Sequence, residues 1–210
     1  MTYTVIDAPQ RSPEWFAARL GRLTGSRAKD MLATIKSGEA AVRRDLRAQL
    51  VVERLTGQSA EDGYVNEDMQ RGIDLEAEAR AAYEARMGVL VDTAGFLAHS
   101  ELMAGYSPDG LVGDDGLIEI KCPKIATHYR RLSSDDAWSD VLPQIRHGLW
   151  MTGRTWADLV SYDNRFPDRL RIVIKRVTAD ALALDEYDEK VRAFLAEVDR
   201  DIAAVRGWEL

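Results

Sequence analysis

Apolar residues recur at helical spacing in several stretches of the chain. Between residues 40 and 55 an apolar side chain falls every three or four positions, and Gly57 follows as a stop signal. Ser12 and Pro13 are a typical helix start, because serine caps the first turn and proline is tolerated at the first helical position. The predicted helices span residues 13–20, 24–32, 40–55, 66–87, 124–131, 142–151 and 185–205.

Beyond Gly88 the pattern changes to short aliphatic runs separated by glycines and acidic turns. These runs predict strands at residues 89–91, 96–97, 111–112, 117–120, 155–162 and 170–177. Helices before, between and after the strands predict an α/β fold, in which a central mixed β-sheet is flanked by helices. The length fits one domain that covers residues 1–210.

Composition narrows the class of protein. Hydrophobic residues make up 46% of the chain and charged residues 30%, as in ordinary soluble globular proteins. Residues 1–10 lack the pattern of a secretory signal and no stretch is long enough for a membrane span, so we expect a cytoplasmic protein without membrane contact. The single cysteine, Cys122, excludes an intrachain disulfide and any metal site built from several cysteines of this chain. The three histidines show no metal-site spacing and are interpreted as surface or packing residues.

The net charge of −7 argues against a nucleic-acid binder, because proteins that bind phosphates usually carry a basic patch. The charge is unevenly distributed, however. Residues 11–47 carry nine bases and four acids, and residues 121–131 carry four bases and no acid. These segments are either local binding sites for a polyanion or the solvated faces of two helices.

Residues 107–121 carry the clearest candidate chemistry. They contain Pro108-Asp109 and, further along, Glu119-Ile120-Lys121. Carboxylate oxygens are ligands that Mg²⁺ prefers, and the bound ion activates water and neutralises charge during phosphodiester cleavage. A nearby lysine orients the water or stabilises the transition state. Asp109, Glu119 and Lys121 are therefore candidates for metal-dependent hydrolysis of a phosphodiester.

A second string in the chain has the same residue types. Pro167-Asp168 is followed by Asp188-Glu189-Lys190. Asp188 and Lys190 lie in a predicted helix, where residues two apart point to different sides. Glu119 and Lys121 lie in a predicted strand, where residues two apart share a face. The alternation of side chains along a strand therefore allows Glu119 and Lys121 to point at one site, whereas helix geometry separates Asp188 from Lys190.

The turn before Glu119 sharpens this prediction. If residues 114–116 form a three-residue loop with Gly116 in the left-handed conformation, Asp109 falls opposite Lys121 and diagonal to Glu119 on one face. A loop of two or four residues would place Asp109 on the other face. The alternative interpretation is an exposed hairpin with ordinary surface charges.

Four ordered segments carry a resemblance to a known family. Residues 107–123, with Ser107-Pro108-Asp109-Gly110 and Glu119-Ile120-Lys121-Cys122-Pro123, resemble the lambda exonuclease family, also called YqaJ-like viral recombinases, within the PD-(D/E)xK nucleases. Residues 15–26, 71–80 and 143–150 are similar to three further motifs of that family, in the same order. The resemblance implies the nuclease core of that superfamily for residues 15–150, and the C-terminal third carries no motif.

The resemblance implies a role for each matched residue of the centre. Asp109, Glu119 and the carbonyl of Ile120 would bind one or two Mg²⁺ ions, for which Mn²⁺ can substitute, and Lys121 would be the catalytic lysine. Glu76 would complete the carboxylate set, whereas without the family it is interpreted as a solvated helix acid. Gly72, inside the same helix, suggests close packing or approach of substrate, because glycine costs a helix about 1 kcal/mol.

The resemblance also implies contacts with DNA. Arg19 and Ser26 match positions that bind a 5′-phosphate, and their alternatives are an interhelical salt bridge and a plain helix cap. Ser107 and Gln144 would make secondary contacts with substrate or with metal-bound water. Arg146 and His147 stand where the family often has glutamine or an aromatic residue, which leaves the detailed contacts of that helix open.

The implied function is a 5′→3′ exodeoxyribonuclease that digests one strand of linear double-stranded DNA and leaves a 3′ single-stranded tail for phage-type recombination in a bacterial host cell. Implied partners are DNA ends, a single-strand annealing protein and two further copies in a homotrimer ring, whose combined bases would line one channel. A monomer in sedimentation analysis would count against the ring. The alternatives are a structure- or sequence-specific endonuclease of the same fold and a non-catalytic DNA-binding protein.

Overall fold

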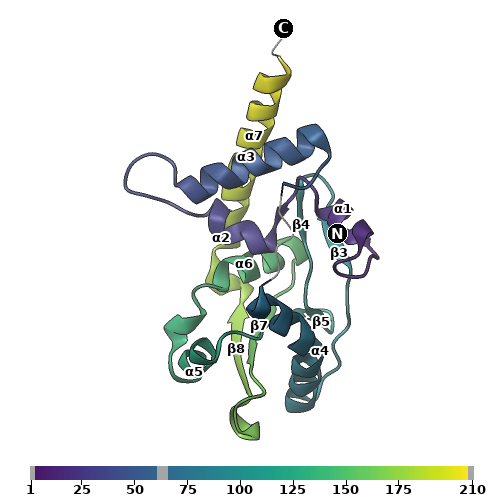
Figure 1. Cartoon of the computed structure of the whole chain (residues 1–210), viewed down its shortest axis with the longest axis vertical. Helices are drawn as coiled ribbons and strands as arrows, with labels where there is room; N and C mark the ends of the chain where they lie inside the picture. The colour runs from purple at the N-terminus through teal and green to yellow at the C-terminus, as the bar shows by residue number, and fades with distance from the viewer. Residues whose placement is uncertain (1–2, 61–65, 208–210) are drawn as a thin grey trace.

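A computed structural model describes residues 3–60 and 66–207, and its helices lie where the apolar periodicity predicts them (Figure 1). The α-helices are α1 (Pro13–Arg19), α2 (Ala28–Met31), α3 (Ala41–Thr56), α4 (Glu67–Met87), α5 (Ile125–Ser133), α6 (Leu142–Thr152) and α7 (Leu184–Arg206). Short 3-10 turns are η1 (Gly25–Arg27), η2 (Asp135–Trp138), η3 (Asp168–Leu170) and η4 (Ala179–Leu182).

The ends of the helices follow their capping residues. The Ser12 hydroxyl accepts a hydrogen bond from the Trp15 amide at the start of α1, and the Asn66 side chain caps α4 in the same way. Gly88 ends α4 in the left-handed conformation, with φ of 68°. Asn66 and Gly88 therefore determine where α4, the helix that carries Gly72 and Glu76, begins and ends.

The strands form two four-stranded sheets rather than the single central sheet that we predicted. The strands are β1 (Tyr3–Ile6), β2 (Leu23–Thr24), β3 (Phe96–His99), β4 (Ala104–Tyr106), β5 (Gly110–Val112), β6 (Gly116–Lys121), β7 (Trp156–Tyr162) and β8 (Ile172–Thr178). The sheet orders are β1-β3-β4-β2 and β5-β6-β7-β8, and each contains one parallel pair. The α/β class with mixed strand directions is confirmed.

The strand predicted at residues 89–91 is wrong. The chain leaves α4 at Gly88, Leu90 is 83% exposed, and an isolated bridge between Asp92 and Leu111 is the pairing found there. The short strands β1, β2 and β4 were not predicted. In β4 a glycine is required for packing, because the ring of Phe96 fills the place of a Cβ at Gly105. Glycine is a poor strand former, so the sequence pattern hides this strand.

The second sheet is covered by helices on both faces (Figure 1). On one face Ile118 and Ile120 pack with Tyr83 of α4. On the other face Leu117 packs in a larger core with residues of α6 and α7, among them Ile145 and Phe194. Side chains alternate along a strand. Glu119 and Lys121 therefore share the face of Leu117, on the side of α6.

The β5–β6 hairpin has a three-residue loop, as predicted, but its register differs from the prediction. Val112 pairs with Gly116, so the loop is residues 113–115, and Gly113 takes the positive φ of 53°. Gly116 is instead a strand residue, where the indole of Trp156 occupies the space of a Cβ. The last pair of this register is Gly110 with Ile118, and the next pair along the two strands would set Asp109 opposite Glu119 rather than Lys121. Because the register shifts by two residues, Asp109 keeps the predicted face.

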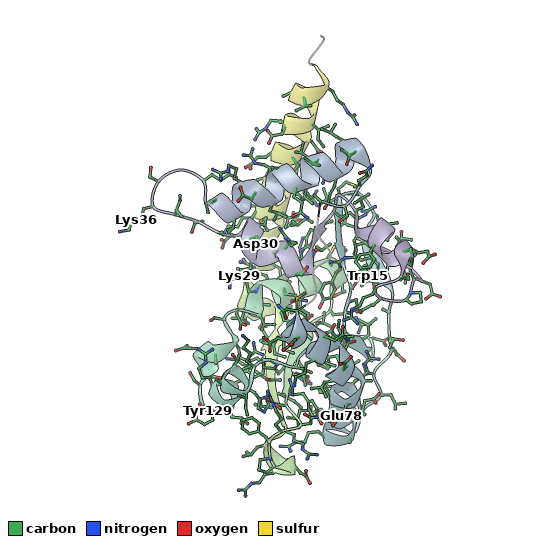
Figure 2. All side chains as sticks on the ribbon, viewed as in Figure 1. Trp15, Lys29, Asp30, Lys36, Glu78 and Tyr129 are labelled. Carbon is green, nitrogen blue, oxygen red and sulfur yellow. The ribbon has the colours of Figure 1, made fainter. Side chains whose placement is uncertain are left out.

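Ion pairs within the chain use much of the positive charge of residues 11–47. Arg43 and Arg47 of α3 pair with acids of α7, where the two helices pack together, and so does Arg54 beyond this segment. Lys36 lies in the loop between α2 and α3, away from the body of the molecule (Figure 2). Among residues 3–60 and 66–207, no helix has the length and apolar character that a membrane span needs.

Candidate active site

One cavity of about 550 Å³ contains every residue that the sequence singled out for the site. Its walls come from α1, η1, α4, α6 and the strands β4 and β6 with the segment after β4. The predicted residues in these walls are Arg19, Ser26, Glu76, Ser107, Asp109, Glu119, Ile120, Lys121 and Gln144. The fold thus gathers four segments that lie far apart in the sequence.

Glu119, Lys121 and Gln144 form a hydrogen-bonded group at the centre. The Lys121 Nζ donates to Glu119 Oε1 at 2.8 Å and to Gln144 Oε1 at 3.1 Å. The Gln144 amide donates to the same Glu119 oxygen at 2.6 Å. Glu119 is 1% exposed, so these charge-assisted bonds are what compensates its buried carboxylate.

Tyr106 belongs to this group and was missed by the sequence analysis. Its hydroxyl donates to Glu119 Oε2 at 3.0 Å, and the side chain is fully buried. Gly25 and Gly148 pack against the ring from two sides, where a Cβ would approach it to 2.8 and 2.6 Å. Burial, and then the neighbouring Glu119, raise the pKa of the Tyr106 hydroxyl well above its usual range. Tyr106 therefore stays protonated and acts as a hydrogen-bond donor.

Asp109 lies beside Glu119 at the end of the hairpin. Its Oδ2 accepts a 2.6 Å hydrogen bond from the backbone amide of Ile120. Burial raises the pKa of Asp109 well above its ordinary value, and the nearby carboxylates of Glu119 and Glu76 raise it further. Lys121 acts in the opposite direction but does not cancel these effects. Burial and the neighbouring carboxylates therefore disfavour the charged form of Asp109.

Lys121 is held in its charged form. Burial alone would lower the pKa of its ammonium group, but Glu119 and Asp109 outweigh this effect and the pKa lies above its ordinary value. A protonated lysine has three N–H donors and no acceptor. Lys121 can therefore donate to a phosphate oxygen or to water, and does not serve as a base.

Glu76 lies on α4 and faces two arginines. Its Oε1 is 3.1 Å from Arg80, and its Oε2 is 3.8 Å from Arg11. Gly72, one turn earlier, also lines the cavity, and nothing lies within 4 Å of the place where its Cβ would be. The sequence suggested either close packing or approach of substrate at Gly72, and close packing against the described residues is wrong. The remaining explanation is that the open space at Gly72 lets substrate approach the helix.

Arg19 and Ser26 flank the cavity from α1 and η1. The guanidinium of Arg19 lies 4.0 Å from the ring centroid of Trp15, in a cation–π contact, and the Trp15 indole donates to the Ser107 hydroxyl at 2.8 Å. Trp15 therefore orients Arg19, and Ser107 orients Trp15. Ser26 lies inside η1 and is exposed, with its hydroxyl 3.2 Å from that of Thr24, so the alternative role of helix cap is wrong.

Arg146 and His147 face away from the cavity. Arg146 donates to the carbonyl of Ala183 at 2.6 Å. His147 is fully buried between the carbonyl of Gly105 and the hydroxyl of Tyr187, at 3.0 and 2.8 Å. Burial lowers the pKa of His147 to about 4. These two residues fix α6 against its neighbours, and Gln144 is the one that reaches the site.

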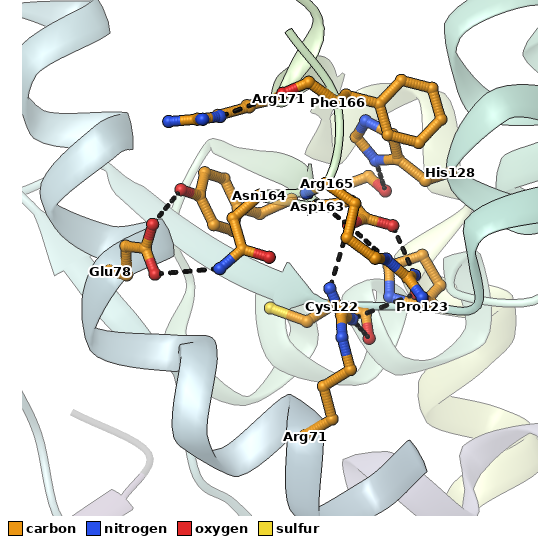
Figure 3. A network of polar contacts seen from close by, with 12 residues as sticks. Arg71, Glu78, Cys122, Pro123, His128, Asp163, Asn164, Arg165, Phe166 and Arg171 are labelled. Carbon is orange, nitrogen blue, oxygen red and sulfur yellow. Dashed lines mark hydrogen bonds and ion pairs between the residues drawn. The ribbon is translucent and has the colours of Figure 1, made fainter. Parts of the chain in front are cut away.

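An ion-pair network around the buried Asp163 ties α4 to the end of β6 (Figure 3). Arg71 of α4 donates to the carbonyls of Cys122 and Pro123, both at 3.5 Å, and to Asp163 at 2.9 Å. Asp163 is fully buried and also accepts three hydrogen bonds from Arg165, one from its backbone amide and two from its guanidinium. Cys122 itself packs beside the cavity, and burial raises the pKa of its thiol to about 12. The network holds the helix of Glu76 against the strand of Lys121.

The second string does not form a comparable group. Lys190 pairs with Glu186, and Asp188 pairs with Arg192, in both cases within α7. The side chain of Asp168 is 91% exposed on η3. Helix geometry separates these charges, as the parity argument predicts.

The donor set of the cavity fits a hard divalent cation. Asp109, Glu119 and the Ile120 carbonyl offer oxygen ligands. Burial, followed by the neighbouring Glu119, raises the pKa of Asp109, and a bound cation would oppose both effects. In the described chain, no three His, Cys, Asp or Glu side chains stand close enough to hold a metal by themselves. Magnesium commonly takes one or two carboxylates and keeps several waters, so the set here is of that kind.

Comparison with known proteins identifies the family. The YqaJ-like viral recombinase domain matches residues 14–155. An alkaline exonuclease (LHK-Exo) from Laribacter hongkongensis is 40% identical, with a TM-score of 0.84 over 93% of this chain and 96% of that one. Its complex with dAMP gives a TM-score of 0.81 over the same shares of the two chains.

A phage related exonuclease from Haemophilus somnus 129PT is 17% identical over 88% of this chain and 96% of that one. Its TM-score of 0.69 shows a shared fold. A comparison of this chain with curated proteins found no match. The resemblance inferred from four sequence motifs is thereby confirmed, and the chain belongs to the YqaJ-like viral recombinase family.

Proposed function

We propose that this protein is a magnesium-dependent exodeoxyribonuclease that digests one strand of linear double-stranded DNA from its 5′ end and leaves a 3′ single-stranded tail. The observation that carries the proposal is the convergence of Asp109, Glu119, Lys121 and Arg19 on one cavity. The 40% identity with an alkaline exonuclease over most of both chains supports the same activity.

In this proposal each group of the cavity has a separate task. Asp109, Glu119 and the Ile120 carbonyl would hold Mg²⁺, and Glu76 would bind it through water or take a second ion. The bound ion supplies activation of water and neutralisation of phosphate charge. Gln144 and Tyr106 keep the Glu119 carboxylate in place, and Lys121 donates to the phosphate oxygen on which charge develops.

The preference for a 5′ end rests on the other side of the cavity. Arg19 presents a forked guanidinium and Ser26 an exposed hydroxyl, a pair suited to a terminal phosphate. The cavity volume of about 550 Å³ is in the range of clefts that hold small ligands. A single nucleotide at a strand end fits that size class.

Linear and circular substrates separate this function from its rivals. With Mg²⁺, we expect the protein to degrade linear duplex DNA and to leave covalently closed circles intact, and chelator should stop the reaction. Cutting of closed circles would favour an endonuclease of the same fold. Binding of linear DNA without any cleavage would favour a non-catalytic DNA-binding protein.

The assembly remains part of the proposal. Arg43, Arg47 and Arg54 of α3 are paired with acids of α7, and Arg44 pairs with Asp45, so one chain offers little free positive charge along that helix. A homotrimer ring would collect the remaining bases of three chains around one DNA molecule. A single-strand annealing protein, as partner in phage-type recombination within the bacterial cytoplasm, would take over the 3′ tail.

A further inference from the structure

Arg11 adopts a backbone conformation that favours glycine. Its φ is 69°, and Ala183 is the other non-glycine residue with positive φ in the described chain. The Ser12 amide donates to the Pro9 carbonyl at 3.0 Å, so Gln10 and Arg11 are the central residues of a tight turn. A positive φ at the third position of such a turn is usually provided by glycine or asparagine. An arginine there strains the backbone.

The strained turn places the Arg11 guanidinium at the catalytic carboxylates. Arg11 lines the 550 Å³ cavity and also a neighbouring cavity of about 360 Å³. Glu76 and Asp109 line both cavities as well, so Arg11 stands at the boundary between them. The turn leads directly into α1, which carries Trp15 and Arg19 (Figure 1).

The contacts that Arg11 makes with the described residues do not account for its position. Its side chain is 46% exposed, and its ion pair with Glu76 spans 3.8 Å. Glu76 already has a closer partner, because Arg80 donates to it at 3.1 Å. A guanidinium has five N–H donors, and within residues 3–60 and 66–207 the long ion pair with Glu76 is the polar contact of the Arg11 side chain. Strain without internal compensation is typical of residues that serve a ligand.

We propose that Arg11 binds a backbone phosphate of the DNA strand at the boundary of the two cavities, on the side of Asp109 and Glu76. Arg19 lines the larger cavity only, so the two arginines would hold different phosphates. This inference rests on the proposed exonuclease function and adds a second phosphate contact to it. Arg11 is a substrate-binding residue in this account, and the left-handed turn is the device that aims it.

Three variants separate the charge from the backbone strain. Arg11→Gly removes both, Arg11→Ala removes the charge and keeps the strain, and Arg11→Lys keeps both. The dissociation constant of a 5′-phosphorylated linear duplex, measured in chelator by fluorescence anisotropy, should rise about tenfold in Arg11→Gly and Arg11→Ala. The slope of log affinity against log salt should fall by about one. Arg11→Lys should keep the wild-type salt slope.

Stability measurements and a matched control complete the test. The urea midpoint of Arg11→Gly should equal or exceed that of the wild type, because glycine adopts this φ without strain. Arg44 is the control: it is 61% exposed, pairs with Asp45 on the surface of α3 and lines neither cavity, so Arg44→Ala should keep the affinity for DNA. A wild-type affinity and salt slope in Arg11→Gly would overturn the inference.

The binding assay also separates the proposed phosphate contact of Arg11 from the proposed exonuclease function. Wild-type protein that binds DNA and never cleaves it would contradict the proposed nuclease, while the Arg11 variants would still test the phosphate contact. Wild-type protein that neither binds nor cleaves DNA would overturn both.

Discussion

Replacing Lys121 by alanine is expected to reduce the rate of DNA cleavage by at least about 100-fold, the usual effect of removing one donor that stabilises a transition state. Lys121 is a positively charged donor that contacts the buried Glu119 at 2.8 Å. The loss should appear in kcat rather than in DNA affinity, because the group acts on charge that develops during reaction. Single-turnover release of nucleotides from a linear duplex, with Mg²⁺ in excess, measures it.

The fold should survive this substitution. Glu119 keeps its hydrogen bonds from Gln144 and Tyr106, so we expect Lys121→Ala to lose only about 1–2 kcal/mol of stability. Lys190→Ala is the matched control, because Lys190 occupies the corresponding place in the second string and pairs within α7. A folded Lys121→Ala enzyme with near wild-type activity would remove Lys121 from the site.

Asp109→Asn is expected to abolish cleavage while leaving the metal-free protein at least as stable as the wild type. Burial, and then the nearby Glu119 and Glu76, disfavour the charged carboxylate. An amide removes that charge while it can still accept the hydrogen bond from Ile120. Stability gained at the expense of activity is common where charges are gathered for function. The melting temperature in chelator checks the first half of this prediction.

The second half concerns magnesium. At about ten times its dissociation constant, Mg²⁺ stabilises a protein that binds it only when folded by about 1.4 kcal/mol, or about 3–6 °C for a chain of this size. We expect this rise in the wild type and in Asp168→Asn, whose carboxylate is 91% exposed and far from the cavity. Asp109→Asn should show little or none. An undiminished rise in Asp109→Asn would exclude Asp109 as a ligand.

The hairpin shows which part of the site the sequence can predict. Strand periodicity and loop length together place Asp109, Glu119 and Lys121 on one face, and this holds although the actual pairing is shifted by two residues. The prediction chose Gly116 as the glycine with positive φ, whereas Gly113 takes that role. Gly116 is instead required in the strand, because the ring of Trp156 packs against it from β7, which is adjacent in the sheet but far away in the sequence. Parity is a local property, whereas exact register depends on tertiary packing.

Other features had no local signal. Tyr106 reaches Glu119 from a three-residue strand with a glycine at its centre, and that glycine is explained by the ring of Phe96. The division into two sheets follows from pairings between distant short strands. The strain at Arg11 becomes visible only as a backbone angle. Short strands, distant packing partners and dihedral angles are the information that one sequence does not contain.

End-labelled DNA tests whether the cavity of Asp109, Glu119 and Lys121 removes nucleotides from a 5′ end. Linear duplexes labelled at the 5′ end or at the 3′ end are incubated with wild type, Lys121→Ala and Lys190→Ala in Mg²⁺. We expect the earliest labelled product to be a mononucleotide from the 5′ label, formed by wild type and Lys190→Ala only, while the 3′ label stays in long fragments. Release of the 3′ label first, or equal release by Lys121→Ala, would contradict it.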